Sequence, residues 1–288
     1  MDTKMRTRNM TSLTNDELEK YLERNDVVFI PCGTIEMHGT MPMDVEYTVA
    51  EALAYKLAED CDGLVLPHLA FFHPGATTIG RGTIYMSMTD GIYFLNTICR
   101  SLIRQGFRRL ILLSAHGPSF QTIMPFITQF FDETKIPLFH GDLFLMIEDA
   151  GMDNSPEGNV SDMFIGAYKI MGRLHEVPLA TQVDASINKP DPDNNTCLPD
   201  FMQDLMPSRA GSYYTAWYYG EKAEHGAMEG CFDSFEELER HAANGVRAFN
   251  ELIKRLNFKK KLDSLRALDL FTQNVILPKY GTWLPENK

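Results

Sequence analysis

The sequence predicts an α/β fold, a layered α/β/α arrangement with a mainly parallel sheet, and three observations support this. Short apolar runs that suit buried strands alternate with longer stretches whose apolar residues recur at helical spacing. The chain has 288 residues, 44% of them hydrophobic, so it can bury a full core. Its strand–helix–strand spacing implies right-handed crossovers, which put helices on both faces of a parallel sheet. We expect one domain over residues 1–288, with an inserted loop at about 188–219 and a C-terminal extension from about 258.

The first elements begin with a capped helix. Thr14-Asn15-Asp16-Glu17 has the pattern of a capping box, and apolar residues at helical spacing follow it. Val27-Val28-Phe29-Ile30 has the length and β-branching of a buried strand. The alanine- and leucine-rich stretch 48–60 predicts the next helix, and Gly63-Leu64-Val65-Leu66-Pro67 predicts the second strand.

The same alternation continues along the chain. Residues 89–105 predict a helix that stops at Gly106, a usual C-terminal residue. Leu110-Ile111-Leu112-Leu113 is the most strongly apolar strand candidate. A helix over 119–133 and a strand near 136–139 complete this half of the predicted sheet.

The second half of the chain is less regular. Asn188 to Tyr219 is rich in proline and longer than a plain connection, and its aromatic cluster at Tyr213–Tyr219 suits a lid or a subunit contact. Residues 235–256 predict a long amphipathic helix. The segment from Asp263 onward is expected to be irregular and to pack across a neighbouring subunit.

Composition excludes several classes of partner. A net charge of −12 and a pI near 5.1 argue against nucleic acid and anionic membranes, because a phosphate-binding face needs an excess of Lys and Arg. The N-terminus lacks the apolar stretch of a signal peptide, so we expect a cytoplasmic protein. The five cysteines are scattered without a CxxC pair, which favours reduced, structural thiols. Cys32 is expected to be a small core residue rather than a nucleophile.

Polar residues with metal-binding chemistry follow the predicted strands. Glu36 and His38 come directly after the first strand, and two apart in an extended segment they point the same way. His116 follows the strand at 110–113, and His140 follows the strand near 136–139. Because the carboxyl ends of parallel strands meet at one edge of the sheet, these side chains predict a site for a divalent cation. A structural role is expected for His140 and for the nearby Asp142.

The chain resembles the creatininase (creatinine amidohydrolase) family. Its motifs follow one another in the family's order and together span roughly residues 31–249. The matching segments are Gly33-Thr34-Ile35-Glu36-Met37-His38-Gly39, Pro42-Met43-Asp44-Val45-Glu46, Gly82-Thr83-Ile84, Gly106-Phe107-Arg108-Arg109, Ser114-Ala115-His116-Gly117 and Gly226-Ala227-Met228.

The resemblance implies a layered α/β hydrolase with a two-metal site, often zinc and manganese, in a homo-oligomer such as a hexamer. Glu36, His38 and His116 match metal ligands of the family. Glu46 stands where the family has a metal-bridging Asp, with one residue fewer after His38, and Asp44 is the competing candidate. One or two ions are therefore expected.

Two departures from the family pattern argue against creatinine as the substrate. Pro118 stands where creatinine-hydrolysing members have a Glu, so a second ion would need another ligand, for which Glu157 and Asp162 are the local options. The family's substrate motif is also unrecognisable, its counterpart being Pro156-Glu157-Gly158-Asn159-Val160-Ser161-Asp162.

These observations predict a metal-dependent hydrolase that opens a small cyclic substrate at an amide-type carbon–nitrogen bond. His73, Glu157 and His225 are candidate catalytic groups for polarising a carbonyl or protonating a leaving group, and Glu224 and Glu229 are weaker candidates. The open alternatives are hydrolysis of a carbon–carbon bond in a cyclic diketone, as in cyclitol catabolism, an inactive relative that binds a small metabolite, and a scaffold subunit.

Overall fold

The computed structural model describes residues 5–153, 159–184 and 231–281. Within these residues one sheet has the strand order β2-β1-β3-β4, and every neighbouring pair is parallel. The predicted α/β class is therefore confirmed. The strands are β1 (Val27–Cys32), β2 (Leu64–Val65), β3 (Arg109–Ser114) and β4 (Phe139–Asp142).

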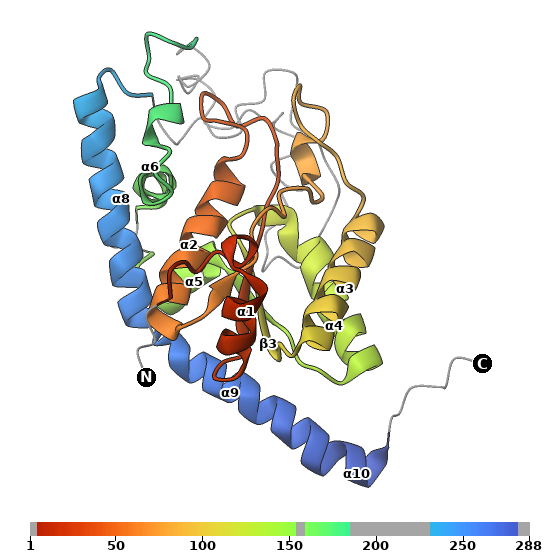
Figure 1. The fold of residues 1–288 in the computed structure, drawn as a ribbon. Helices are drawn as coiled ribbons and strands as arrows, with labels where there is room; N and C mark the ends of the chain where they lie inside the picture. Colours follow the sequence, from red (N-terminus) through yellow and green to blue (C-terminus); the bar gives the residue numbers. More distant parts are fainter. Residues whose placement is uncertain (1–4, 154–158, 185–230, 282–288) are drawn as a thin grey trace.

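Helices connect the strands and continue as an outer layer in the second half of the chain (Figure 1). Most α-helices carry a buried apolar stripe, whereas short 3-10 turns occupy the loops. The α-helices are α1 (Asn15–Leu22), α2 (Val45–Cys61), α3 (Met88–Gln105), α4 (Phe120–Thr134), α5 (Leu143–Asp149), α6 (Val160–Ile170), α8 (Phe235–Leu256), α9 (Phe258–Phe271) and α10 (Leu277–Tyr280). The other turns are η1 (Met10–Ser12), η2 (Gly75–Thr77), η3 (Gly117–Ser119), η5 (Leu174–Glu176) and the π-helical η7 (Thr272–Ile276).

Alternate strand residues face opposite helical layers. In β1, Val27 and Phe29 pack with α2, α6 and α8, whereas Val28 and Ile30 pack with α1, α3 and α4. This is the period of two expected of a strand. Figure 1 shows α2, α6 and α8 on one side of the sheet and α3 and α4 on the other. The molecule thus has two apolar cores, one on each face, which is the predicted layered arrangement.

The strand order creates a switch point between β1 and β3. The chain leaves β1 through α2 toward β2, and it leaves β3 through α4 toward β4 on the opposite side. Right-handed crossovers in opposite directions place α2 and α4 on opposite faces, as observed. Loops that leave β1 and β3 therefore diverge, and the space between them is where α/β proteins place their sites.

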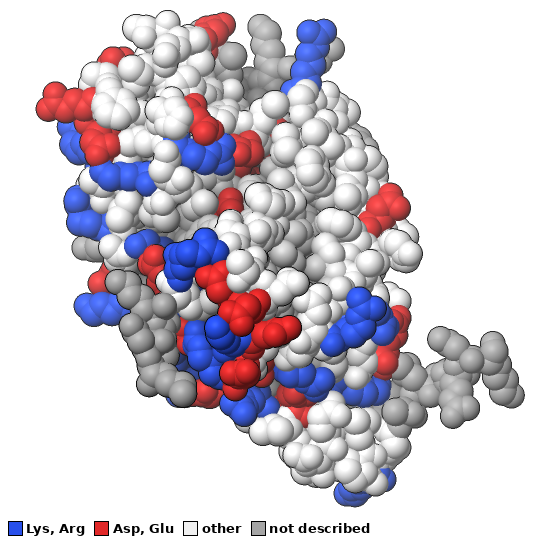
Figure 2. Space-filling view, viewed as in Figure 1, with Lys and Arg blue, Asp and Glu red and all other residues white. Residues whose placement is uncertain are grey.

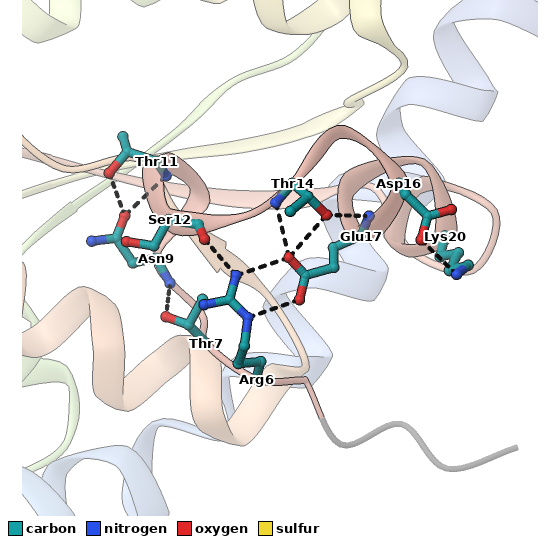
Figure 3. Close-up of polar contacts among 9 residues, drawn as sticks. All are labelled: Arg6, Thr7, Asn9, Thr11, Ser12, Thr14, Asp16, Glu17 and Lys20. Atoms are coloured by element: carbon teal, nitrogen blue, oxygen red, sulfur yellow. Dashed lines mark hydrogen bonds and ion pairs between the residues drawn. The ribbon is translucent and has the colours of Figure 1, made fainter.

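The capped start predicted for the first helix is confirmed (Figure 3). The Thr14 hydroxyl accepts a hydrogen bond from the Glu17 amide at 3.3 Å, and the Glu17 carboxylate accepts one from the Thr14 amide at 2.8 Å. Arg6 donates to both oxygens of the same carboxylate. Hydrogen bonds from Arg6 and then from Thr14 lower the pKa of Glu17 to about 2. These contacts tie the N-terminal segment to the start of α1.

Some predicted boundaries differ from the observed ones. The helix expected from Thr48 begins at Val45, because Asp44 already occupies the N-cap position. The strand expected near 136–139 is β4, which begins at Phe139 and includes His140 and Asp142. Ile136 is buried in the core on the α3 and α4 face, but it lies outside the β3–β4 ladder.

The expectation of an irregular segment from Asp263 is wrong. This segment lies in α9 and continues through η7 into α10. Phe258, Leu262 and Leu265 recur at helical spacing and are buried, so an apolar stripe stabilises the helix. Figure 1 shows α9 running across one end of the sheet, with α10 projecting beyond the body.

Two glycines allow α6 and α8 to lie side by side. A Cβ atom on Gly245 would come 1.8 Å from the Asp162 carbonyl oxygen, and one on Gly166 would come 2.5 Å from the Gly245 carbonyl carbon. Only a residue without a side chain fits this crossing. The outer helix α8 is thereby held close to α6, which in turn packs against α2.

The visible surface carries charges of both signs. Figure 2 shows Lys and Arg intermixed with Asp and Glu around α1, whereas much of the face above α3 is uncharged. In the part of the chain that the structure describes, no helix is both long and apolar enough to cross a bilayer. The predicted insertion at 188–219 lies outside the described residues.

Candidate metal centre

The loop after β1 carries the first two candidate ligands into the protein interior. Glu36 and His38 are both buried, and the Glu36 amide is fixed by a 3.0 Å hydrogen bond to the Met43 carbonyl. At the start of this loop a Cβ on Gly33 would lie 2.5 Å from the Tyr47 Cα. Glycine at this position therefore lets the strand exit touch the first turn of α2.

This close approach brings the third ligand to the site. Glu46 lies in the first turn of α2 next to Tyr47, and it is also buried. One ligand atom each from Glu36, His38 and Glu46 lies within 4.8 Å of the others. The distance from His38 Nε2 to Glu46 Oε1 is 3.9 Å.

His116, at the end of β3, completes the group from the other side of the switch point. Its Nδ1 atom contacts Glu46 Oε2 and lies 3.4 Å from Glu36 Oε1. Its Nε2 atom lies 3.1 Å from the His73 carbonyl oxygen, which can only accept a hydrogen bond. The proton on Nε2 is therefore fixed, and Nδ1 faces the two carboxylates. We call Glu36, His38, Glu46 and His116 the metal cluster.

The metal cluster gathers negative charge away from water. Burial would lower the pKa of His116, but the carboxylates of Glu46 and Glu36 outweigh it and raise that pKa well above its usual value. Burial would raise the pKa of Glu46, but His116 and His38 outweigh it and hold that pKa well below its usual value. Buried carboxylates need a compensating positive charge, which in the metal-free protein comes from the His116 imidazolium.

The donor set fits a divalent cation. Two carboxylates and two imidazoles are ligands that zinc and manganese accept. The His73 carbonyl accepts a hydrogen bond from His116 Nε2 and so fixes the orientation of the His116 ring. Metal-binding histidines usually have a partner of this kind on the nitrogen that does not bind the metal. A cation among these four side chains would replace the proton on His116 Nδ1.

Two threonine hydroxyls that sequence reasoning missed also contact the cluster. Thr77 Oγ1 donates to Glu36 Oε2 at 2.6 Å, and Thr34 Oγ1 donates to Glu46 Oε2 at 3.0 Å. Thr34 lies within the motif that carries Glu36, so its proximity was a usable signal. Thr77 comes from a distant loop, and its contact depends on a path that the sequence pattern does not reveal.

Asp44 has other partners. Its carboxylate accepts hydrogen bonds from Arg173 at 2.8 Å and from the Tyr168 hydroxyl at 2.9 Å. Of the two acidic candidates, it is Glu46 that the structure places with Glu36. Asp44 instead ties the start of α2 to α6 and to the turn that follows α6.

Other sequence candidates also lie in separate interactions. Asp162 accepts a 2.6 Å hydrogen bond from His241 of α8, at the crossing with α6. His140 contacts the Ser114 hydroxyl at 2.9 Å, and Asp142 caps α5, in line with the structural roles expected for them. Glu157, Glu224, His225 and Glu229 lie outside the described residues.

His73 lies beside the metal cluster through its backbone. Its ring meets Tyr85 edge-on at a centroid distance of 5.9 Å, and its Nδ1 is buried without a hydrogen-bond partner among the described residues. Burial and the neighbouring His116 lower the pKa of His73, which favours a neutral imidazole. Pro118 packs close by, since a Cβ on Gly75 would come 2.5 Å from its Cγ.

Cys32, at the end of β1, is a fully buried core residue. Burial, and then the neighbouring Cys99, raise the pKa of the Cys32 thiol well above its usual value. A thiol with a raised pKa is a poor nucleophile. This environment agrees with the structural role expected for Cys32.

Comparisons with known proteins fit this architecture. Residues 11–164 match the family model described as Creatininase: Creatinine amidohydrolase, a range that includes the whole metal cluster. A creatinine amidohydrolase from Pseudomonas putida is 33% identical over 111 residues, which is 36% of this chain. The aligned part spans 43% of that relative's length.

Solved creatininase structures share the fold. A structure named Creatininase Mn has a TM-score of 0.60 and 18% identity, covering 91% of this chain and 98% of its own. A mutant creatininase of Zn-Zn type has a TM-score of 0.62 with 18% identity and the same coverage of both chains. At this identity the likeness establishes the α/β architecture.

Proposed function

Because the chain belongs to the creatininase family, we propose that it is a metal-dependent hydrolase that opens a small cyclic substrate at an amide-type carbon–nitrogen bond. The observation that supports this most is the buried cluster of two carboxylates and two imidazoles at the switch point of the sheet. Buried carboxylates need a compensating positive charge, and a divalent cation would supply it in place of the His116 imidazolium. The enzyme assignment rests on this cluster.

The chemistry follows from the ligands. A divalent cation with an open position supplies hydroxide near neutral pH and polarises a carbonyl. Glu36, His38, Glu46 and His116 would hold the cation, while the His73 carbonyl keeps the His116 ring in the orientation that exposes Nδ1. The neutral His73 side chain is the candidate to carry a proton between the attacking and leaving groups.

Pro118 supports a substrate other than creatinine. It stands where creatinine-hydrolysing members have a carboxylate, and its apolar ring packs against Gly75. A changed substrate side beside the four candidate metal ligands fits another small ring. A cyclic diketone opened at a carbon–carbon bond is the second candidate, since the same attack on a polarised carbonyl would serve it.

The test combines metal content with turnover. Protein purified without chelator should carry stoichiometric divalent metal and should open members of a panel of cyclic amides and cyclic diketones, with products identified by mass spectrometry. His116→Ala should abolish both metal and turnover. His241→Gln, outside the cluster, should retain both. Metal-free wild-type protein that cannot be loaded would overturn the proposal.

A catalytically inactive relative that binds a small metabolite is a separate possibility, also suggested by Pro118. Calorimetric titration with the same panel distinguishes the two. Binding that persists after complete removal of metal, together with no turnover of any compound, favours the inactive relative. Turnover that depends on added metal favours the enzyme.

A further inference from the structure

We propose that Thr34 and Thr77 are positioning residues that orient the carboxylates of Glu46 and Glu36 for binding a divalent cation. The inference rests on the proposed metal-dependent function and adds the groups that hold two of the candidate ligands in place.

The Thr77 hydroxyl fixes one oxygen of Glu36. Thr77 Oγ1 lies 2.6 Å from Glu36 Oε2, and both side chains are almost entirely buried, at 2% and 0% exposed. A hydrogen bond to a charged group in such a site stabilises the structure more than an exposed one, because water cannot replace it. The contact joins segments 41 residues apart, so it also fixes the loop that contains η2 against the strand exit.

The Thr34 hydroxyl does the same for Glu46. Thr34 Oγ1 lies 3.0 Å from Glu46 Oε2, and Thr34 is itself fully buried. The same oxygen contacts His116 Nδ1, and this is the contact that a bound cation would replace. Thr34 follows β1 and Glu46 begins α2, so this hydrogen bond spans the tight junction at Gly33.

With these oxygens oriented, the remaining ones face the imidazoles. Glu36 Oε1 lies 3.4 Å from His116 Nδ1, and Glu46 Oε1 lies 3.9 Å from His38 Nε2. The two threonines therefore leave one oxygen of each carboxylate turned toward the imidazoles, where a cation would bind. Pro118 contributes an apolar ring to this region, close to Gly75 at the start of the turn that contains Thr77.

The test is metal binding by the full-length protein, independent of turnover. Metal-depleted protein is titrated with Zn²⁺ or Mn²⁺, and affinity and stoichiometry are measured by calorimetry. The wild type should bind the metal. Thr77→Val and Thr34→Val should weaken binding about 10–100-fold, the usual effect of losing a partner that orients a metal ligand. Thr77→Ser and Thr34→Ser keep the hydroxyl and should restore most of the affinity.

Thr78→Val is the matched control, because its hydroxyl bonds the Gly75 carbonyl and not a ligand of the cluster. Circular dichroism identifies any variant that fails to fold. If a valine variant at one threonine fails to fold, the valine and serine variants at the other threonine still test the positioning role. A wild type that binds no metal would refute the proposed function itself. Metal binding by the wild type with unchanged affinity in the valine variants would refute the positioning role.

Discussion

Metal binding should release a proton from His116. In the metal-free protein the pKa of His116 is raised well above its usual 6.5 by Glu46 and Glu36, although burial opposes them. The imidazole is therefore protonated at neutral pH, with one proton on Nδ1 facing the carboxylates and one on Nε2 facing the His73 carbonyl. A cation that binds Nδ1 must displace the first of these protons.

The pH dependence of metal affinity follows from the release of one proton for each ion bound. While the pH is below the raised pKa of His116, each increase of one pH unit should strengthen apparent metal binding about tenfold, or about 1.4 kcal/mol. The dependence should flatten once the pH exceeds that pKa. Glu46 does not contribute in this range, because its pKa is held well below its usual value and it is already ionised.

The assay is calorimetric titration of Zn²⁺ at pH 7 in buffers with different ionisation enthalpies. The observed enthalpy should vary linearly with the buffer enthalpy, with a slope that reports release of about one proton. His241→Gln removes an imidazole outside the cluster and should leave the slope unchanged. Binding without proton release, or with an affinity that does not change between pH 6 and pH 7, would refute this account of His116.

Further predictions concern stability. Gly33→Ala and Gly245→Ala both push a Cβ atom into the backbone, so each should destabilise the protein by about 1–3 kcal/mol in thermal unfolding, but Gly33→Ala alone should also weaken metal binding. Leu57→Ala empties a fully buried site and should cost about 2–5 kcal/mol with the metal affinity retained, as measured by denaturant unfolding. Without metal, the ion pair between Glu46 and His116 should stabilise the protein at pH values between the lowered pKa of Glu46 and the raised pKa of His116. The melting temperature of metal-depleted protein should therefore fall at both ends of that range. A melting temperature that does not change with pH would contradict this prediction.

Much of the fold could be predicted because the first helix and the central strands have recognisable local sequence patterns. The capped start of α1 has a clear signature, and strands buried on both faces, such as β1 and β3, read as continuous apolar runs. The C-terminal helix was missed although Phe258, Leu262 and Leu265 carry helical spacing. Charged residues separate these apolar positions in the sequence, and the helical stripe they form is recognised only when the core against which it packs is known.

The candidate site was readable in part. Glu36 and His116 were assigned to one edge because parallel strands end together. The choice between Glu46 and Asp44 could not be made, because it depends on where α2 begins and on the partners Arg173 and Tyr168, which are remote in sequence. The contact between Thr77 and Glu36 could not be predicted either, because it depends on the path of a loop 41 residues away in the sequence.

All four side chains of the metal cluster come from residues 36–116, whereas α8 and α9 are added later as an outer covering. Lengthening or exchanging those late helices would change the outline of the molecule without replacing any of these four side chains. The periphery can therefore diverge while the proposed metal centre keeps its candidate ligands.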